Sequence, residues 1–480
     1  MGGSKVPVDQ SHELRKDSVG TAEVAALSFA GLAPTMAMAL GTSFAAIQAG
    51  AAVPLAYLLG MLGSLALAYV IVVFTRRVAA SGVAFTWIGA VFGKNPGFVA
   101  GWLYAGGWMF ATAVVLALSA VSLNALFAQA KINIHWFIFF VILLVIAAGL
   151  SMYGVKLSLR VQLALELISV ATLFVVMLVV VLKGGASGNT LEPFNPAYSA
   201  NGWSGIGFGL IYGFSAFAGF EAGAALGLES KNPRRTIPTA IILSLLISAG
   251  FYIFVTYALS IGYGVDNAAK WAADPTPLDT ITGRYLNGGV ASVIDAMVAV
   301  SAFSAGMGVL ALSTRVFYGM ANHGLAPDWV RRTHPVTKTP YIAIAVASVI
   351  ALVVGAVVGL SAGTGVLIGV LAGANTLAFI LIYAVISIAA IWAFGRGTSV
   401  PTDLIVKVGV PIVAIVLLGF SLYASVWPQP PFPYNLAAPL VIGWGLIGVV
   451  IAVIQRRRGE APTLDIEEEV TAGHMPVGPA

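Results

Sequence analysis

The chain has 480 residues, of which 59% are hydrophobic and only 9% are charged. Soluble domains carry about 25% charged residues, so the composition excludes an ordinary soluble protein. The formal net charge of +5 is not a nucleic-acid signal, because membrane proteins keep Lys and Arg in their cytoplasmic loops. The absence of cysteine excludes disulfides, thiol catalysis and cysteine-bound metals.

Apolar blocks of about 20 residues recur along the chain, which is the length that a helix needs to cross a bilayer. We therefore predict twelve membrane-spanning helices in a helical, multi-pass membrane protein. They lie at residues 20–48, 53–74, 97–128, 134–152, 155–182, 203–228, 236–263, 288–320, 341–360, 364–394, 405–426 and 436–455.

The distribution of basic residues predicts the orientation. With the N-terminus inside, all but four of the 24 Lys and Arg residues fall in cytoplasmic segments; the exceptions are Lys131, Lys183, Lys270 and Arg284. The positive-inside rule then places both termini in the cytoplasm of an inner-membrane protein. The polar segment 1–18 has no apolar core with a cleavage site, so we expect no cleaved signal peptide.

Two predicted spans contain helix-breaking residues in their middles. The first has Pro34, which removes a backbone donor and clashes with the preceding turn. The sixth has Gly213, Gly219 and Gly223. Interrupted helices at matching places in two halves of a chain point to a substrate site at the membrane midplane. The alternative is that Pro34 only kinks its helix and the glycines only allow close helix packing.

Three pairs of motifs, in order along the chain, carry a family resemblance. They are Ala80–Trp87 with Phe92–Trp102, Gly219–Glu221 with Glu229–Pro238, and Arg315–Pro327 with Thr339–Pro340. With these motifs, residues 18–455 resemble the amino acid–polyamine–organocation transporter superfamily.

Two departures from the family pattern are visible. Ala33-Pro34-Thr35 stands where the family has a Gly-Ser-Gly-like break, and Ser169 aligns with a lysine that fills a sodium position in several members.

The resemblance implies a leucine-transporter-like fold of five-plus-five inverted repeats with discontinuous first and sixth helices. The expected parts are a cytoplasmic segment at 1–18, repeats at 19–182 and 203–394, two further helices at 404–456, and a disordered tail at 457–480. The first and sixth helices are expected to rock against a scaffold made by the third, fourth, eighth and ninth.

The two breaks leave backbone groups that can bind a zwitterion. N–H groups at the start of a half-helix attract a carboxylate, and carbonyls at the end of one attract an ammonium or sodium ion. We assign the carboxylate to Ala33, Pro34, Thr35 and Met36, with Gly31 in the same break. We assign the ammonium to carbonyls near Phe29, Ala30 and residues 214–217. The predicted substrate contacts on the sixth span are Phe214, Ser215, Phe217, Ala218, Gly219 and Phe220, with the phenylalanines covering the substrate or packing in the core.

Two acids fall at membrane depth, where a charged side chain costs about 2.5–3.5 kcal/mol on insertion scales. Glu221 is a candidate proton carrier or pH-sensitive gate, and the alternative is a carboxylate that holds the break open. Glu166 is the second candidate for coupling or gating. It alternatively caps a helix break or pairs with Arg160.

For several other side chains the sequence signal is weaker and leaves two roles open. Ser301 and Ser304 lie one turn apart and are a possible oxygen site for sodium, unless they bond to their own helix. Tyr104 and Trp108, also one turn apart, are predicted to line the pathway or to pack. Asp295 is expected near the outer vestibule or at a solvated helix end. A basic inner loop with Lys231, Arg234 and Arg235 is expected to set topology or to form an inner gate with Glu229, Arg76 and Arg77.

Enzyme functions are not favoured, because the five histidines lack metal-ligand spacing and there is no nucleotide-binding loop. We expect no cofactor and no nucleic-acid partner. The predicted function is a secondary transporter that imports amino acids or amines with protons, a small or aromatic neutral amino acid being favoured over a diamine. The alternatives are a sodium-coupled symporter or amino acid exchanger, and a non-transporting membrane sensor with the same fold.

Overall fold

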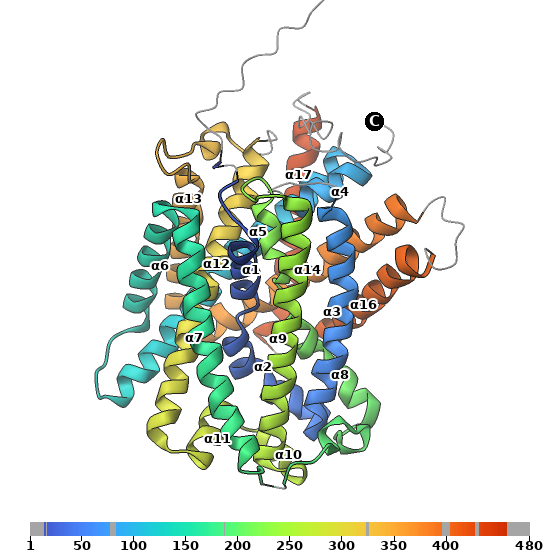
Figure 1. Ribbon diagram of the computed structural model, residues 1–480. Helices are drawn as coiled ribbons and strands as arrows, with labels where there is room; N and C mark the ends of the chain where they lie inside the picture. The colour runs from blue at the N-terminus through green and yellow to red at the C-terminus, as the bar shows by residue number, and fades with distance from the viewer. Residues whose placement is uncertain are drawn as a thin grey trace, which may run out of the picture.

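The computed structural model describes residues 14–15, 17–76, 83–186, 188–322, 326–395, 404–427 and 432–457. The predicted disordered tail beyond 457, and Arg77 of the expected inner gate, lie outside these residues. The described chain is built from long helices joined by short turns (Figure 1).

The long helices follow the apolar blocks of the sequence. They are α1 (Thr21–Leu32), α2 (Pro34–Ala49), α3 (Val53–Thr75), α5 (Lys94–Gln129), α6 (Trp136–Tyr153), α7 (Val155–Leu182), α8 (Gly202–Ala216), α9 (Pro233–Tyr263), α12 (Gly288–Asn322), α13 (Tyr341–Ser361), α14 (Thr364–Phe394), α16 (Val410–Val426) and α17 (Ala437–Arg457).

Shorter elements lie between them. They are α4 (Ala84–Phe92), α10 (Ala268–Ala272), α11 (Pro277–Tyr285), a π-helical turn η8 (Ile405–Gly409), and the 3-10 segments η2 (Gly50–Ala52), η3 (Glu192–Phe194), η4 (Pro196–Tyr198), η5 (Phe220–Leu226), η6 (Val265–Asn267), η7 (Asp328–Arg331) and η9 (Tyr434–Leu436).

The predicted multi-pass helical class is confirmed. Within the described residues, eleven stretches are long and apolar enough to cross a membrane. The first of them, Thr21–Thr75, contains both predicted spans 20–48 and 53–74, which meet at the turn of η2. The predicted span 203–228 is the helix α8 followed by the 3-10 segment η5. The short helix α4, in a region expected to be a loop, is an addition.

The interrupted helices lie inside the bundle. In Figure 1, α1 and α2 follow one another down the middle of the molecule, with α7, α9 and α12 around them. α1 packs against α7, α9 and η5, whereas α2 packs against α8. By contrast, α16 and α17 expose many large apolar side chains, such as Val416 and Ile442, as expected of helices that face lipid.

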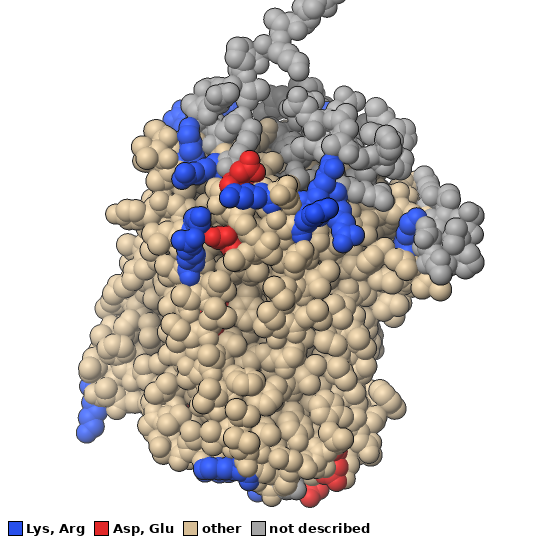
Figure 2. Space-filling model, in the orientation of Figure 1, with Lys and Arg blue, Asp and Glu red and all other residues tan. Residues whose placement is uncertain are grey.

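On the face of the described chain that Figure 2 shows, exposed charged side chains lie at the two ends of the bundle. Figure 2 shows Lys and Arg gathered at the end where α1 begins, above a broad uncharged belt, with fewer charges at the opposite end. This belt is what a hydrocarbon layer requires, since a charge at its centre is costly. The asymmetry agrees in direction with the one predicted from the sequence.

Candidate functional site

The first helix breaks where the sequence predicts it. α1 ends at Leu32, Ala33 takes the left-handed conformation with φ 43° and ψ 61°, and α2 begins at Pro34. Proline suits this first helical position because its missing N–H has no partner there in any case. The break therefore leaves carbonyls at the end of α1 and N–H groups at the start of α2, as required for binding opposite charges.

The second break lies beside the first. α8 ends at Ala216, Gly219 has φ 97°, and the chain continues as the 3-10 segment η5. Backbone touches backbone here, since a Cβ built on Gly31 would lie 2.7 Å from the Gly219 carbonyl oxygen, and one on Gly219 the same distance from that of Gly31. The Gly223 N–H also donates to the Ser28 hydroxyl at 3.1 Å. These glycines serve the close approach of the two interrupted helices.

Gly219→Ala is expected to destabilise the fold and to abolish function. The left-handed conformation costs a non-glycine residue about 1–2 kcal/mol, and the new methyl group meets a carbonyl that cannot move aside. Thermal unfolding of the purified protein measures the loss. The matched control is Gly250→Ala in α9, where a Cβ meets nothing within 4 Å. Equal melting temperatures for the two variants would show that the contact with Gly31 is dispensable.

A tyrosine on α9 connects both breaks. The Tyr252 hydroxyl lies 3.2 Å from the Leu32 carbonyl oxygen and 2.9 Å from that of Ala216, and the side chain is fully buried. Its ring packs against Phe217, with ring centroids 5.0 Å apart. The hydroxyl has one hydrogen, so it donates to one carbonyl at a time. Tyr252 thus pairs with the carbonyl at one or the other of the two helix ends.

Glu221 lies in η5, directly after the second break, with 1% of its surface exposed. Its Oε1 accepts hydrogen bonds from the Tyr104 hydroxyl of α5 at 3.2 Å and the Tyr383 hydroxyl of α14 at 2.5 Å. Among the described residues, its Oε2 has no hydrogen-bond partner. The carboxyl group therefore connects the unwound segment to two long helices and keeps one oxygen available to a proton or a ligand.

Glu166 of α7 lies at the other side of the first break and is fully buried. The Ser301 hydroxyl donates to its Oε1 at 2.8 Å, and the Ser169 hydroxyl donates to the Glu166 backbone carbonyl at 2.9 Å. Thr35 in turn donates to the Ser169 hydroxyl at 3.3 Å. This cluster joins α2, α7 and α12 through oxygen atoms.

The structure brings most of the predicted site residues into one region around the two breaks. The Met36 N–H, expected to meet a substrate carboxylate, donates to Ser301 at 3.3 Å. Ser215 lines a cavity of about 290 Å³ between α8, α14 and α16. Trp108 is nearly buried and packs edge-on against Tyr104, with centroids 5.9 Å apart, and against Phe379 at 4.4 Å.

Several expected pairings are replaced by others. Glu166 does not pair with Arg160, whose guanidinium lies 3.6 Å from Glu23 instead, because Glu166 points inward to Ser301. The Ser304 hydroxyl donates across to the Gln162 carbonyl of α7 rather than to its own helix. Asp295 accepts from the Gln129 side chain at 3.1 Å, near the end of α5.

The partner of Glu229 is Arg315 of α12, rather than the basic loop that follows Glu229. Arg315 Nε lies 2.7 Å from Glu229 Oε2, and its Nη2 lies 3.3 Å from Oε1. The Glu229 carbonyl accepts from the N–H groups of Ser18 and Val19, at 2.9 and 3.1 Å. The segment before α1 is therefore fastened to the loop after η5 at the basic end of the bundle.

Sequence reasoning missed Tyr252 and Tyr383. Both hydroxyls fall in the middle of apolar spans, and a buried tyrosine hydroxyl usually has a hydrogen-bond partner. That signal was available, but the identity of the partner depends on which helices pack together.

The fold and this region define a class of protein: a multi-pass helical membrane transporter with two interrupted helices in contact at its centre. Comparison with known proteins narrows the class. The family profile described as amino acid permease matches residues 20–454, and the chain belongs to this family.

Individual relatives share between 26% and 28% of their aligned residues with this chain. The chain is 28% identical to the branched-chain amino acid permease BcaP of Lactococcus lactis subsp. cremoris, over 64% of this chain and 69% of the relative. It is 26% identical to the low-affinity putrescine importer PlaP of Escherichia coli K12, over 72% of this chain and 75% of that protein. It is 27% identical to an uncharacterized transporter of Mycobacterium bovis, over 92% and 95%.

Among solved structures, a Na⁺-coupled sialic acid symporter in its substrate-bound outward-open state has the same fold, with a TM-score of 0.52 and 15% identity. The alignment covers 85% of this chain and 90% of that structure. The predicted family and the leucine-transporter-like fold are thereby confirmed.

Proposed function

We propose that the protein is a secondary active permease that imports amino acids with protons by alternating access. The observation that carries the proposal is the buried Glu221 carboxyl group, placed at a helix break and bonded by Tyr104 and Tyr383. A carboxyl group at such a place changes its contacts when the break opens or closes, which couples proton binding to the conformation. Glu166, beside the other break, is the second candidate for the proton.

The proposed substrate is a neutral amino acid. Carbonyl and N–H groups at the breaks suit a zwitterion, and the nearby side chains Phe214, Phe217 and Phe220 are apolar and buried. A diamine would need carboxylates for both of its cationic ends, and the two in this region, Glu221 and Glu166, each already accept hydroxyl hydrogen bonds on Oε1. The similarity to BcaP favours a branched-chain substrate, whereas the similarity to PlaP favours a diamine.

In the proposed motion the first and sixth helices rock against the third, fourth, eighth and ninth, so that each of the repeats 19–182 and 203–394 contributes to both moving parts. We place both termini in the cytoplasm of an inner membrane, because the basic end of the bundle carries the start of α1 and the end of α17 (Figures 1 and 2). The Arg315–Glu229 pair then closes the inner side of the pathway.

Uptake of labelled leucine into proteoliposomes tests the transport function. We expect counterflow of leucine and inhibition of it by isoleucine and valine, with putrescine without effect. Flux of putrescine alone would show that the substrate class is wrong. No substrate-dependent flux for any amino acid or polyamine would favour the non-transporting sensor.

A sodium-coupled mechanism is the second candidate, supported by the oxygen cluster of Glu166, Ser169, Ser301 and Thr35, since sodium prefers hard oxygen ligands. For proton coupling, we expect leucine uptake to be equal in sodium and choline media. Ser301→Ala should then reduce uptake by the same factor in both media, because it loosens the contact of α12 with α2. Uptake that needs sodium, with Ser301→Ala removing only the sodium-dependent part, would establish sodium coupling instead.

A further inference from the structure

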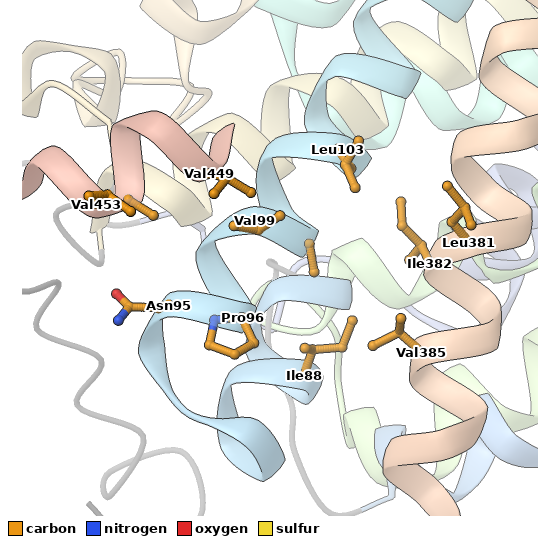
Figure 3. A pocket seen from close by; sticks show the side chains of 12 residues that line it. Ile88, Asn95, Pro96, Val99, Leu103, Leu381, Ile382, Val385, Val449 and Val453 are labelled. Atoms are coloured by element: carbon orange, nitrogen blue, oxygen red, sulfur yellow. The ribbon is translucent and has the colours of Figure 1, made fainter. Parts of the chain in front are cut away.

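A deep apolar groove opens on the surface of the bundle, away from the two helix breaks. It has a volume of about 480 Å³ and runs between α5, α14 and α17, with Ile88 of α4 at one end (Figure 3). Val449 and Val453 of α17 and Leu381 of α14 line it and are each more than one third exposed, so the groove is open to the outside. Its twelve lining residues are all apolar except Asn95.

The groove lies in the half of the belt nearest the basic end. Along α5 its wall runs from Asn95 to Leu103, which is about 12 Å of helix. The wall begins one residue after the exposed Lys94, the first residue of α5. Its other walls lie in the second half of α14, up to Val385, and in the second half of α17, up to Val453. One end of the groove is therefore at the level of the head groups, and the rest is at the level of hydrocarbon.

The helices that line the groove carry charge of one sign. The four helices α4, α5, α14 and α17 contain no Asp or Glu, whereas Lys94 stands exposed beside the polar end of the groove. A narrow apolar channel with a cation and an amide at its membrane-surface end matches a molecule with a hydrocarbon chain and an anionic head. A basic residue near the membrane surface attracts anionic lipids with about 1 kcal/mol.

We propose that this groove binds one anionic phospholipid, with an acyl chain along α5 and α17 and its phosphate at Lys94 and Asn95. This site is separate from the transport site and goes beyond the proposed function.

The position of the groove gives the bound lipid a consequence. Leu103 and Ile382 line the groove, and the residues that follow them, Tyr104 and Tyr383, donate to Glu221 on the inner side of the same two helices. A chain in the groove fills the space behind these tyrosines and fixes the separation of α5 from α14. The lipid is therefore expected to support the geometry of the Glu221 hydrogen bonds.

Binding is tested on the full-length protein by native mass spectrometry, titrating phosphatidylglycerol or phosphatidylcholine into the same detergent. We expect the wild type to retain one phosphatidylglycerol in preference to phosphatidylcholine. Val453→Trp fills the groove and should remove this lipid, and Lys94→Gln should weaken its binding about fivefold, the effect of one basic residue near a membrane surface.

The matched controls are Val353→Trp and Lys131→Gln. Val353 is another exposed apolar residue, 52% accessible on α13, and Lys131 follows the opposite end of α5. Both variants should bind phosphatidylglycerol as the wild type does. Equal binding by Val453→Trp and Val353→Trp, or no preference for the anionic lipid, would overturn the proposal.

A second copy of the chain is the competing occupant. Because the sequence has no cysteine, Val453→Cys introduces a single thiol into the groove. We expect no disulfide-linked dimer when membranes containing this variant are oxidised. A dimer formed in high yield would show that the groove is an interface between copies, and would overturn the lipid assignment.

The effect on transport is measured separately, and this part alone rests on the proposed function. Proteoliposomes of phosphatidylcholine with added phosphatidylglycerol should transport leucine faster than those of phosphatidylcholine alone, and Val453→Trp should remove the difference. If wild-type flux is the same with and without phosphatidylglycerol, the lipid does not support the Glu221 hydrogen bonds. A protein without flux in either membrane would instead fail the proposed function, while the binding result would stand.

Discussion

Glu221→Gln is expected to abolish proton-driven accumulation of substrate while leaving exchange of substrate across the membrane intact. The glutamine oxygen can still accept from Tyr104 and Tyr383, so the helix break keeps its hydrogen bonds. An amide, however, takes up no proton in the physiological range. A gradient of one pH unit is worth about 1.4 kcal/mol, so a one-proton symporter accumulates its substrate up to tenfold, and the variant accumulates none.

The measurement is leucine uptake into proteoliposomes with and without a pH gradient, beside counterflow at equal pH. The control is Glu192→Gln, a carboxylate of the 3-10 segment η3 that accepts from Tyr198 and lies away from both breaks. It should accumulate leucine as the wild type does. Full accumulation by Glu221→Gln would transfer the proton role to Glu166, for which Glu166→Gln is then the decisive variant.

Tyr383→Phe distinguishes the role of the Glu221 carboxyl group from the role of its hydrogen bonds. It removes one of the two hydroxyls bonded to Glu221 Oε1 without changing the acid. Under the proton mechanism, accumulation persists but its dependence on pH changes, since a hydrogen bond to a charged group contributes about 1.5–3 kcal/mol. If the pH dependence of accumulation is unchanged in this variant, the Tyr383 hydroxyl has no part in proton coupling.

The helix breaks could be predicted from the sequence because their causes are local. Pro34 removes a backbone donor and clashes with the preceding turn, which favours an end of α1 just before it, and Gly219 permits a positive φ that other residues avoid. The position of Glu221 beside a break follows directly from these signals. Local chemistry thus indicates where the chain is interrupted.

The partners of the buried acids could not be predicted, because they come from distant parts of the chain. Tyr383 is 162 residues from Glu221, and Ser301 is 135 residues from Glu166. For Glu229, nearby basic residues were the natural expectation, but the loop places Lys231, Arg234 and Arg235 outward in water. Arg315, which packs inward on α12, supplies the charge instead. The packing of the helices, and not distance along the sequence, therefore determines which cation pairs with Glu229.

Arg315→Ala is expected to be the most destabilising substitution of a charged residue in this protein. The Arg315 and Glu229 side chains are 6% and 3% exposed, and Arg315 also donates to the Ala311 carbonyl. Removing one partner of a buried pair leaves an uncompensated charge and costs about 3–5 kcal/mol. Because Glu229 also fastens the segment before α1, we expect the inner side to open as well as the melting temperature to fall.

Thermal unfolding of the purified protein compares Arg315→Ala with Arg331→Ala. Arg331 forms a surface pair with Asp328 at 3.7 Å, in which the side chains are 41% and 81% exposed, and such pairs contribute about 0–1 kcal/mol. The double variant Arg315→Met with Glu229→Gln should regain much of the lost stability, because it removes the unpaired charge. If it is instead as unstable as Arg315→Ala, the loss lies in packing around α12 and not in the buried charge. Restored stability without restored transport would show that the ion pair itself serves the closing of the inner side.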